Sequence, residues 1–382
     1  MKAVKFLSLV LALTIVLGGC GAPVETDLQT ETEQETLAEI SKETVAVAED
    51  KYSQKTVNMK DAADKYKALG RTYVLGTSLV CDHSASGLDL ALDCQGDVIV
   101  RVTASKADTT FTVDVDGLVT KNVTFGQGSG EYTVATGLEK GFHVIRLVSE
   151  GGYSKPCKID SVTFEGSLVK MYENDFYIEF IGDSITAGYG LGATAGEVHD
   201  ATLAYPYLAA QRLGADYTIC ALSGLGIAYG AADEFENYYP YQSVSRGKTA
   251  YVPTKTPDLV VINLHTNDNY QWYSNGGNVE GDKYNYATFD AKFDDMIKTI
   301  EGNYGKDVPM LFVFGCMASD KWTLATDQSI KLIEEKYIPA GYDMKVVTLY
   351  TSRDGKEAHP SASGAKKQAE ELAAFIKENY IK

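Results

Sequence analysis

The sequence predicts two folded regions of different class, an all-β sandwich over residues 59–170 and an α/β region over residues 171–382. In the first region, short apolar or alternating runs recur at regular spacing, with glycine-rich turns between them, which is the pattern of a β-sandwich. In the second region, continuous apolar runs alternate with segments of helical periodicity. That alternation is typical of a parallel sheet that helices cover on both faces.

The strands of the predicted sandwich are marked by apolar runs separated by turn signals such as Val115-Asp116-Gly117. In chain order the runs are TYVLGTSLVC, LDLALDC, DVIVRVTA, TFTVDVDG, YTVAT, HVIRLVS and IDSVTFEG. His143 lies in one of these runs, where its neighbours alternate, and this favours a structural histidine. No pattern in this region points to catalysis.

The α/β region contains five predicted strands and four predicted helices. The strands are FYIEFIG, DYTICAL, DLVVINL, PMLFVFG and MKVVTLY, and the helices cover residues 201–213, 289–300, 327–337 and 365–380. Parallel sheets of this kind bind ligands at the carboxyl ends of their strands. The segments that directly follow the strands are therefore the candidates for function.

The first twenty residues predict a lipoprotein signal peptide. Lys2 and Lys5 form a charged start, and residues 6–17 form an apolar stretch too short for a committed membrane span. The sequence LGGC that ends at Cys20 resembles a bacterial lipobox, in which the cysteine carries a lipid; the alternative is an ordinary signal peptide and a secreted protein. We therefore expect a protein lipid-anchored through Cys20 at the extracellular face of a bacterial cell membrane.

Residues 21–58 are rich in Glu, Thr, Gln, Ala and Val and almost free of aromatic side chains, so we predict a disordered acidic tether. The chain carries 35 basic and 52 acidic residues, a net charge of −17, which argues against a nucleic-acid partner. We expect a monomer. The histidines are scattered singly and predict no metal site. Cys220 and Cys316 each end an apolar run, which favours buried thiols, and a disulfide between Cys81 and Cys94 is the open alternative.

Four residues follow strands or precede the last helix in an order that suits acyl transfer. This chemistry needs a hydroxyl nucleophile, an imidazole that takes its proton, and donors for the oxyanion. Ser184 supplies the hydroxyl and His359 the imidazole, while the backbone N–H groups of Ser184 and Gly224 and the side-chain amide of Asn267 supply the donors. Taken singly, each is also explained by a turn or a helix cap. Their order and shared position after strands favour a catalytic site.

The motifs GDSIT, SGLG, TND and HPS resemble the four blocks of the SGNH (GDSL) hydrolases. IGDSITAGYG is also similar to the opening block of carbohydrate esterase family 2, the acetylxylan esterase-like enzymes. This resemblance implies a three-layer α/β/α, flavodoxin-like hydrolase domain preceded by a β-sandwich of jelly-roll type. It implies Ser184 as nucleophile, His359 as base, and Gly224 and Asn267 as oxyanion donors, with no metal or other cofactor.

Two positions depart from the family pattern. The family usually has Asp three residues before the histidine, and here Lys356 stands there. Asp354, Glu357 or a main-chain carbonyl are the candidates for orienting His359. His265 stands where the family has Gly, and its ring could narrow the pocket or contact substrate; the alternative is a partly exposed loop residue.

Aromatic residues near the predicted site suggest a platform for sugar rings. Trp272 follows the TND block, together with Tyr270 and Tyr273, and Trp322 follows the PMLFVFG strand. We predict that Trp272 and Trp322 contact substrate, although aromatic residues also commonly pack long loops.

The function expected from the resemblance is removal of acetyl groups from polysaccharides or oligosaccharides of xylan or mannan type, by a serine esterase that forms an acyl-enzyme. Three alternatives use the same site: a lipase, a thioesterase or a peptidoglycan O-acetylesterase. A non-catalytic surface glycan-binding protein is a further alternative, motivated by the missing Asp at position 356.

Overall fold

The computed structural model describes residues 51–192, 198–243, 249–276 and 283–381. The predicted signal peptide with Cys20, and the predicted tether up to residue 50, lie outside these ranges. Among the helices within them, none combines the length and the apolar character that a membrane crossing needs.

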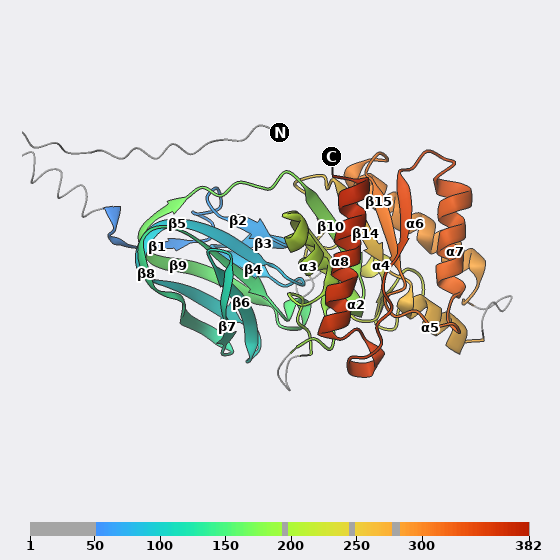
Figure 1. Cartoon of the computed structure of the whole chain (residues 1–382), viewed down its shortest axis with the longest axis horizontal. Helices are drawn as coiled ribbons and strands as arrows, with labels where there is room; N and C mark the ends of the chain where they lie inside the picture. The colour runs from blue at the N-terminus through green and yellow to red at the C-terminus, as the bar shows by residue number, and fades with distance from the viewer. Residues whose placement is uncertain (1–50, 193–197, 244–248, 277–282, 382) are drawn as a thin grey trace, which may run out of the picture. The chain divides into compact units, whose positions relative to one another are not determined.

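Residues 54–169, called the β region below, form one antiparallel sheet in the order β3-β4-β9-β5-β8-β6-β7, with β1 paired to β9 and β2 paired to β5 (Figure 1). The bounds of its strands are β1 Gln54–Asn58, β2 Lys67–Leu69, β3 Thr72–Leu75, β4 Ser78–Cys81, β5 Gly87–Ala104, β6 Thr109–Val115, β7 Leu118–Phe125, β8 Gly128–Ser149 and β9 Cys157–Val169.

Two strands are longer than the sequence predicts. The runs LDLALDC and DVIVRVTA belong to a single strand of 18 residues, β5, and YTVAT and HVIRLVS belong to a single strand of 22 residues, β8. Register shifts on both sides of Gly96 interrupt their pairing. Bulges bend a strand and increase its twist. Both halves of the bent strand contribute to one buried cluster, which contains Leu88, Leu90, Leu92, Val98, Val100, Val102, Ile145 and Leu147.

The predicted boundary of the tether at residue 58 is wrong. Residues 54–58 form β1, which pairs with residues 161–165 of β9. The apolar content of this stretch is low, and only Val57 among these residues packs against the core. The backbone hydrogen bonds to β9, rather than side-chain burial, therefore account for its order.

Cys81 and Cys94 do not form the disulfide that the sequence leaves open. Both thiols are free and buried. Cys81 faces Cys157 across the pairing of β4 with β9, whereas Cys94 lies on β5. All five described cysteines are buried free thiols, which is the alternative that the apolar surroundings of Cys220 and Cys316 favour.

Residues 177–379, called the α/β region below, contain a five-stranded parallel sheet in the order β11-β10-β14-β15-β16. The strands are β10 Tyr177–Gly182, β11 Asp216–Ala221, β14 Leu259–Asn263, β15 Met310–Phe314 and β16 Met344–Thr348. Numbered along the chain this order is 2-1-3-4-5, the flavodoxin-like arrangement, in which ligands bind at the switch point beside the first strand. The predicted fold class, an α/β region preceded by a β region, is confirmed.

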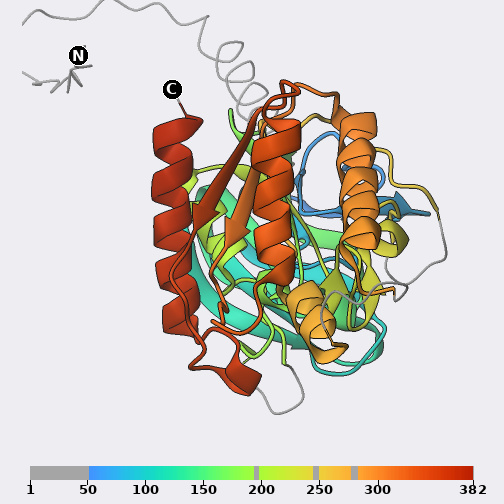
Figure 2. The ribbon, with the colours of Figure 1, turned by 90° about the vertical axis from the view of Figure 1, so that its right-hand side faces the viewer.

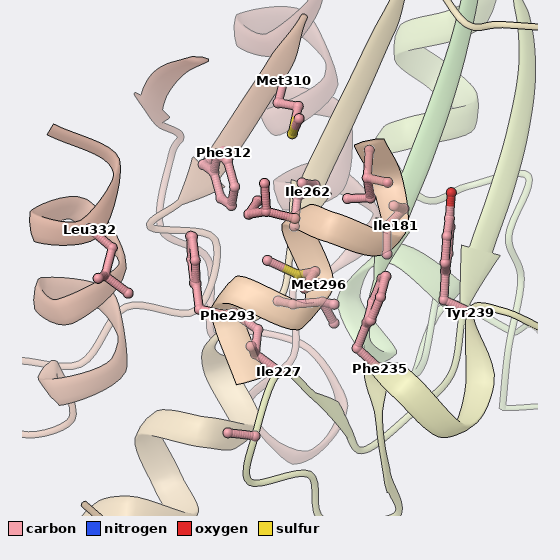
Figure 3. Packing of buried hydrophobic residues seen from close by; sticks show 14 of the residues in the cluster. Ile181, Ile227, Phe235, Tyr239, Ile262, Phe293, Met296, Met310, Phe312 and Leu332 are labelled. Atoms are coloured by element: carbon pink, nitrogen blue, oxygen red, sulfur yellow. The ribbon is translucent and has the colours of Figure 1, made fainter. Parts of the chain in front are cut away.

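Helices cover both faces of this sheet because successive strand residues point to opposite sides. Ile178 and Phe180 pack toward α3 (Tyr205–Leu213) and α8 (Ala362–Asn379). Ile181 and Ile262 pack toward α6 (Tyr286–Tyr304) and α7 (Leu324–Leu332), as Figure 3 shows. Figure 2 shows α8 on one side of the sheet and α6 and α7 on the other. The short elements are η1 Gly152–Ser154, α2 Ser184–Ala187, β12 Leu225–Gly226, β13 Asp233–Glu234, α4 Phe235–Tyr238, α5 Thr266–Ser274, η2 Ile333–Tyr337 and η3 Lys356–Ala358.

The β region and the α/β region share a buried seam. Leu69, Ala85 and Val148 of the β region belong to the same apolar cluster as α3 and α8. The Tyr217 hydroxyl on β11 donates a hydrogen bond of 2.9 Å to the Ala85 carbonyl across this seam. The β region is therefore packed against the sheet that carries the candidate site.

Candidate active site

Ser184 lies where a tight turn leads from β10 into α2. Asp183 caps this helix, with a side-chain oxygen that accepts a hydrogen bond of 2.9 Å from the Ile185 N–H. Ser184 is the first residue of α2, and the first N–H groups of a helix have no acceptor within it. A Cβ on Gly182 would lie 2.0 Å from the Thr186 hydroxyl, so the turn requires glycine there. The side chain of Ser184 is thereby fixed at the end of the strand, with 8% of the residue exposed.

His359 meets Ser184 although 175 residues separate them. The Nε2 atom of His359 lies 2.7 Å from the Ser184 Oγ, a hydrogen-bond distance. His359 stands between η3 and α8, and Ser361 caps α8 by accepting from the Gly364 N–H over 3.2 Å. The cap fixes where the last helix begins and so helps to position the imidazole. The predicted pair is thus brought together at the carboxyl end of β10.

Backbone carbonyls, not a carboxylate, face the other nitrogen of the imidazole. The Nδ1 atom of His359 lies 3.2 Å from the Lys356 carbonyl oxygen and 3.3 Å from that of Glu357. Glu357 has φ of +50° and Ala358 φ of +59°, a left-handed backbone that is unusual for these residues. This strained turn directs the carbonyls toward the ring.

The two carboxylates that could orient His359 form hydrogen bonds with other residues instead. The Glu357 carboxylate accepts a hydrogen bond of 2.9 Å from the Tyr189 hydroxyl. Asp354 accepts from Ser352 and Ser361, and these hydrogen bonds lower the pKa of Asp354 to about 2. Of the three candidates that the sequence leaves open, the main-chain carbonyl is the one in contact with His359.

Burial affects the pKa of the His359 imidazole. His359 is half-buried, and loss of solvent lowers its pKa below the ordinary value, although the two carbonyls act in the opposite direction. The Tyr189 ring packs against the imidazole with ring centroids 4.6 Å apart. His359 is therefore neutral, and able to accept a proton, at neutral pH.

Gly224 and Asn267 follow the two strands that flank β10. Gly224, after β11, has φ of +85°, and a Cβ there would lie 2.7 Å from the Ala232 Cβ, so only glycine fits. The Asn267 amide, at the start of α5, donates to the Leu225 carbonyl over 2.9 Å and to the Asp183 carboxylate over 3.4 Å. All four predicted catalytic residues thus follow strands at one edge or contact one another there.

A buried carboxylate that the sequence reasoning did not assign holds the Gly224 segment in place. Asp268 accepts hydrogen bonds of 2.8, 2.7 and 2.6 Å from the N–H groups of Ile227, Ala228 and Tyr229. Burial raises its pKa, and burial raises the pKa of Asp183 to about 7. The TND motif thus carries a donor in its Asn and a backbone anchor in its Asp.

His265 is a buried residue, so the alternative of a partly exposed loop residue is wrong. It is 6% exposed, its ring packs on Phe314 with centroids 4.8 Å apart, and burial lowers its pKa to about 4. With Trp322 it lines a hollow of about 80 Å³. Within the described ranges, the His265 Nδ1 and the Trp322 Nε1 are both buried without a hydrogen-bond partner. Two residues that line the hollow thus each carry a ring N–H or ring nitrogen without a protein partner among the described residues.

The prediction that Trp272 contacts substrate is wrong. Trp272 is fully buried and packs against Tyr229 and Phe289 in the core beneath α6. The segment after the TND block is a helix, and on a helix residues three apart share a face. Tyr270 and Tyr273 therefore point outward together, at 48% and 50% exposure, while Trp272 points inward.

Tyr270 and Tyr273 pack around Trp322 instead. The ring centroids of Tyr270 and Trp322 lie 5.3 Å apart, and those of Tyr273 and Trp322 lie 6.2 Å apart. Trp322 is half-buried at the edge of the hollow. An aromatic surface is thus present where the sequence predicts one, but Trp322 and the two tyrosines form it.

Sequence reasoning missed a second cluster beside the site. His199, Tyr153 and Ser223 meet there: the His199 Nε2 lies 2.8 Å from the Tyr153 hydroxyl and 3.0 Å from the Ser223 Oγ. Tyr189 packs on both His199 and His359 and so connects the two clusters. The three members come from separate segments; Ser223 begins the SGLG motif, but no local motif marks Tyr153 or His199. In the described part of the chain, no three His, Cys, Asp or Glu side chains gather closely enough to hold a metal ion.

The parallel sheet and the serine–histidine pair at its switch point together define the class of the α/β region, a serine hydrolase fold. Residues 180–378 match the model of the GDSL-like Lipase/Acylhydrolase family, and the chain belongs to this family.

Two curated relatives match parts of the chain. Cellulase/esterase CelE of Acetivibrio thermocellus is 29% identical over 222 residues, which are 52% of this chain and 25% of CelE. The acetylxylan esterase / glucomannan deacetylase of Cellvibrio japonicus is 36% identical over 104 residues, 24% of this chain and 29% of the relative. The matched residues thus span less than a third of the length of each relative.

A solved structure shares the fold over most of the chain. The family two carbohydrate esterase from Clostridium thermocellum, in complex with cellohexaose, superposes with a TM-score of 0.69 at 22% sequence identity. The match covers 82% of this chain and 98% of that structure. The combination of a β region with an α/β region is therefore shared by that esterase.

Proposed function

We propose that the chain is a carbohydrate O-acetyl esterase that removes acetyl groups from a polysaccharide or oligosaccharide of xylan or mannan type. The observation that carries the proposal is the 2.7 Å contact between the Ser184 Oγ and the His359 Nε2. The names of the relatives supply the substrate class: one is an acetylxylan esterase / glucomannan deacetylase, and another solved esterase holds cellohexaose.

In the acylation step, the Ser184 Oγ attacks the acetyl carbonyl carbon while its proton passes to the His359 Nε2. The carbonyls of Lys356 and Glu357 accept from Nδ1–H and so keep the Nε2 lone pair directed at the serine. The negative charge that develops on the carbonyl oxygen is held by the N–H groups of Ser184 and Gly224 and by the Asn267 amide.

The tetrahedral intermediate then breaks its bond to the sugar oxygen, which leaves with the proton from His359. Water, deprotonated by the same imidazole, attacks the acetyl-enzyme, and acetate is released as the Ser184 oxygen regains its proton. Asn267 is suited to its role because its 3.4 Å contact with Asp183 is long enough to be exchanged for the oxyanion, while the 2.9 Å bond to Leu225 keeps the amide oriented.

The burial of the nucleophile favours a short acyl group, since only 8% of Ser184 is exposed. The test measures acetate released from acetylated xylan, acetylated glucomannan and O-acetylated peptidoglycan, beside hydrolysis of p-nitrophenyl acetate and p-nitrophenyl butyrate. We expect release from xylan or glucomannan, and faster hydrolysis of the acetate ester. Equal rates on butyrate would favour a lipase or thioesterase, and polysaccharide binding without release would contradict an enzyme.

The predicted lipid on Cys20 belongs to the same proposal. A lipid at that position would hold the protein at the outer face of the cell membrane, where large polysaccharides are accessible. The residues between Cys20 and the folded part would let the hydrolase act at a distance from the membrane surface.

The pH dependence of turnover follows from the state of His359. Only the neutral imidazole accepts the serine proton, and burial lowers its pKa below 6.5, so the neutral form persists into mildly acidic solution. We expect kcat/KM for p-nitrophenyl acetate to be constant above neutrality and to fall with decreasing pH, with an apparent pKa below 6.5. A midpoint above 7 would contradict the assignment of His359 as the base.

Replacement of each tryptophan by alanine is expected to change a different property: substrate binding for Trp322 and stability for Trp272. Trp322→Ala removes an aromatic surface beside the hollow, and a loss of about 1.4 kcal/mol would raise KM for acetylated xylo-oligosaccharides about tenfold. The effect on p-nitrophenyl acetate should be smaller. Trp272→Ala instead opens a cavity in the core and should lower the free energy of unfolding by about 3–5 kcal/mol. Equal losses on both substrates in Trp322→Ala would contradict a role in sugar binding.

A further inference from the structure

The loop between β8 and β9 carries a tyrosine of the β region to the edge of the candidate site. The Tyr153 hydroxyl oxygen accepts a hydrogen bond of 3.1 Å from the Ser223 N–H. The same oxygen lies 2.8 Å from the His199 Nε2, which in turn lies 3.0 Å from the Ser223 Oγ. Ser223 directly precedes Gly224, so these contacts join the β region to the segment with the proposed oxyanion donor.

The loop that carries Tyr153 is itself fixed. Gly152 has φ of +49°, and a Cβ there would lie 2.6 Å from the Ser84 Cα, so only glycine fits at this close approach. The Gly152 N–H donates to the Ser149 hydroxyl over 3.1 Å, and the Ser154 hydroxyl donates to the Gly151 carbonyl over 2.8 Å. The Tyr153 ring packs on the His199 ring with centroids 5.1 Å apart. The hydroxyl is thus held in one position from both sides.

The contacts on either side of the Gly224 N–H determine its direction. On one side the Ser223 N–H is bonded to Tyr153, and on the other side the Gly224 carbonyl accepts from the Ala232 N–H over 3.0 Å. With both neighbouring groups held, the peptide between Ser223 and Gly224 cannot rotate freely. An oxyanion donor lowers the barrier only if it already points at the place where the charge develops.

We propose that Tyr153, supported by His199, is a positioning residue that orients the Gly224 N–H, and that the β region thereby completes the oxyanion hole of the α/β region. The inference rests on the proposed function only through the role of Gly224 as an oxyanion donor. It gives the β region a part in catalysis that does not require it to bind carbohydrate.

The test compares two Tyr→Phe variants that each remove one hydroxyl from a hydrogen bond across the seam. Tyr153→Phe removes the acceptor of the Ser223 N–H. Tyr217→Phe, the matched control, removes the donor to the Ala85 carbonyl, which is also bonded across the seam but not to the candidate site. Hydrolysis of p-nitrophenyl acetate gives kcat and KM for each variant, and the melting temperature reports on folding.

We expect Tyr153→Phe to lower kcat about tenfold with KM within twofold of the parent value, since complete loss of one donor costs about 10²–10³ in kcat. Tyr217→Phe should lower the melting temperature, because the Ala85 carbonyl loses its donor, without a comparable loss in kcat. His199→Gln should lower kcat less than Tyr153→Phe does, because the Ser223 N–H keeps its acceptor.

Three outcomes would overturn the inference: kcat of Tyr153→Phe within twofold of the parent, an equal loss of kcat in Tyr217→Phe, or a larger loss in His199→Gln than in Tyr153→Phe. The measurement uses a small ester, so it is separate from the test of the carbohydrate substrate. A parent protein that hydrolyses p-nitrophenyl acetate but releases no acetate from polysaccharides would contradict the proposed function and leave this comparison intact.

Discussion

Replacement of Ser184 by alanine is expected to lower kcat for p-nitrophenyl acetate by at least about 10⁴-fold, as removal of a serine nucleophile does elsewhere. The hydroxyl that lies 2.7 Å from His359 would be lost, and no oxygen would remain to form the acetyl-enzyme. KM is not expected to rise, because the donors for the carbonyl oxygen stay in place. Full turnover in this variant would contradict the serine mechanism.

Three further variants make the Ser184 result specific. His359→Ala should cost nearly as much, and the double variant should cost little more than either single change, because the two groups act as one unit. Ser78→Ala is a matched control, since Ser78 is an equally buried serine on β4 that bonds to Asp160 over 2.6 Å. This control should retain kcat. Additive losses in the double variant would argue against direct proton transfer between Ser184 and His359.

The place of the candidate catalytic residues could be predicted because the topology of a parallel sheet brings them together. Ser184, Gly224 and Asn267 follow strands whose carboxyl ends share one edge, so local sequence and strand type suffice to place them. His359 could be predicted from its motif before the last helix. The orientation of His359 by main-chain carbonyls remained one of three candidates. It depends on the left-handed turn at Glu357 and Ala358, and the residue types at these two positions do not predict such a turn.

The errors arise where the face of an element, or its partner, decides the outcome. Substrate contact is predicted for Trp272 from its place after the TND block alone, but the segment is a helix, and the helical period turns Trp272 inward and Tyr270 and Tyr273 outward. The sequence predicts two strands where β5 is a single bent strand, because the glycine at position 96 is compatible with a bulge as well as with a turn. The role of Tyr153 depends on contacts between distant segments, which periodicity does not report.

A large loss of stability is expected from a change in the seam between the β region and the α/β region. Arg71 of the β region is 2% exposed, and its guanidinium lies 3.2 Å from the Glu179 carboxylate on β10. It also donates to the carbonyls of Tyr239 and Tyr241 over 2.7 and 3.2 Å. The Tyr239 hydroxyl donates to the other Glu179 oxygen over 2.7 Å. A fully buried charge pair thus connects the β region to the central strand of the site.

Arg71→Met is expected to lower the free energy of unfolding by about 3–5 kcal/mol, because it leaves the Glu179 carboxylate buried without its counter-charge. Urea denaturation measures the loss. Arg71→Met combined with Glu179→Gln should recover much of it, since no unpaired charge remains. The matched control is Arg212→Met, which breaks the exposed pair with Glu370 at 2.7 Å and should cost no more than about 1 kcal/mol. Losses of equal size in the two single variants would mean that burial of the Arg71 pair contributes nothing, and the seam would then depend on apolar packing alone.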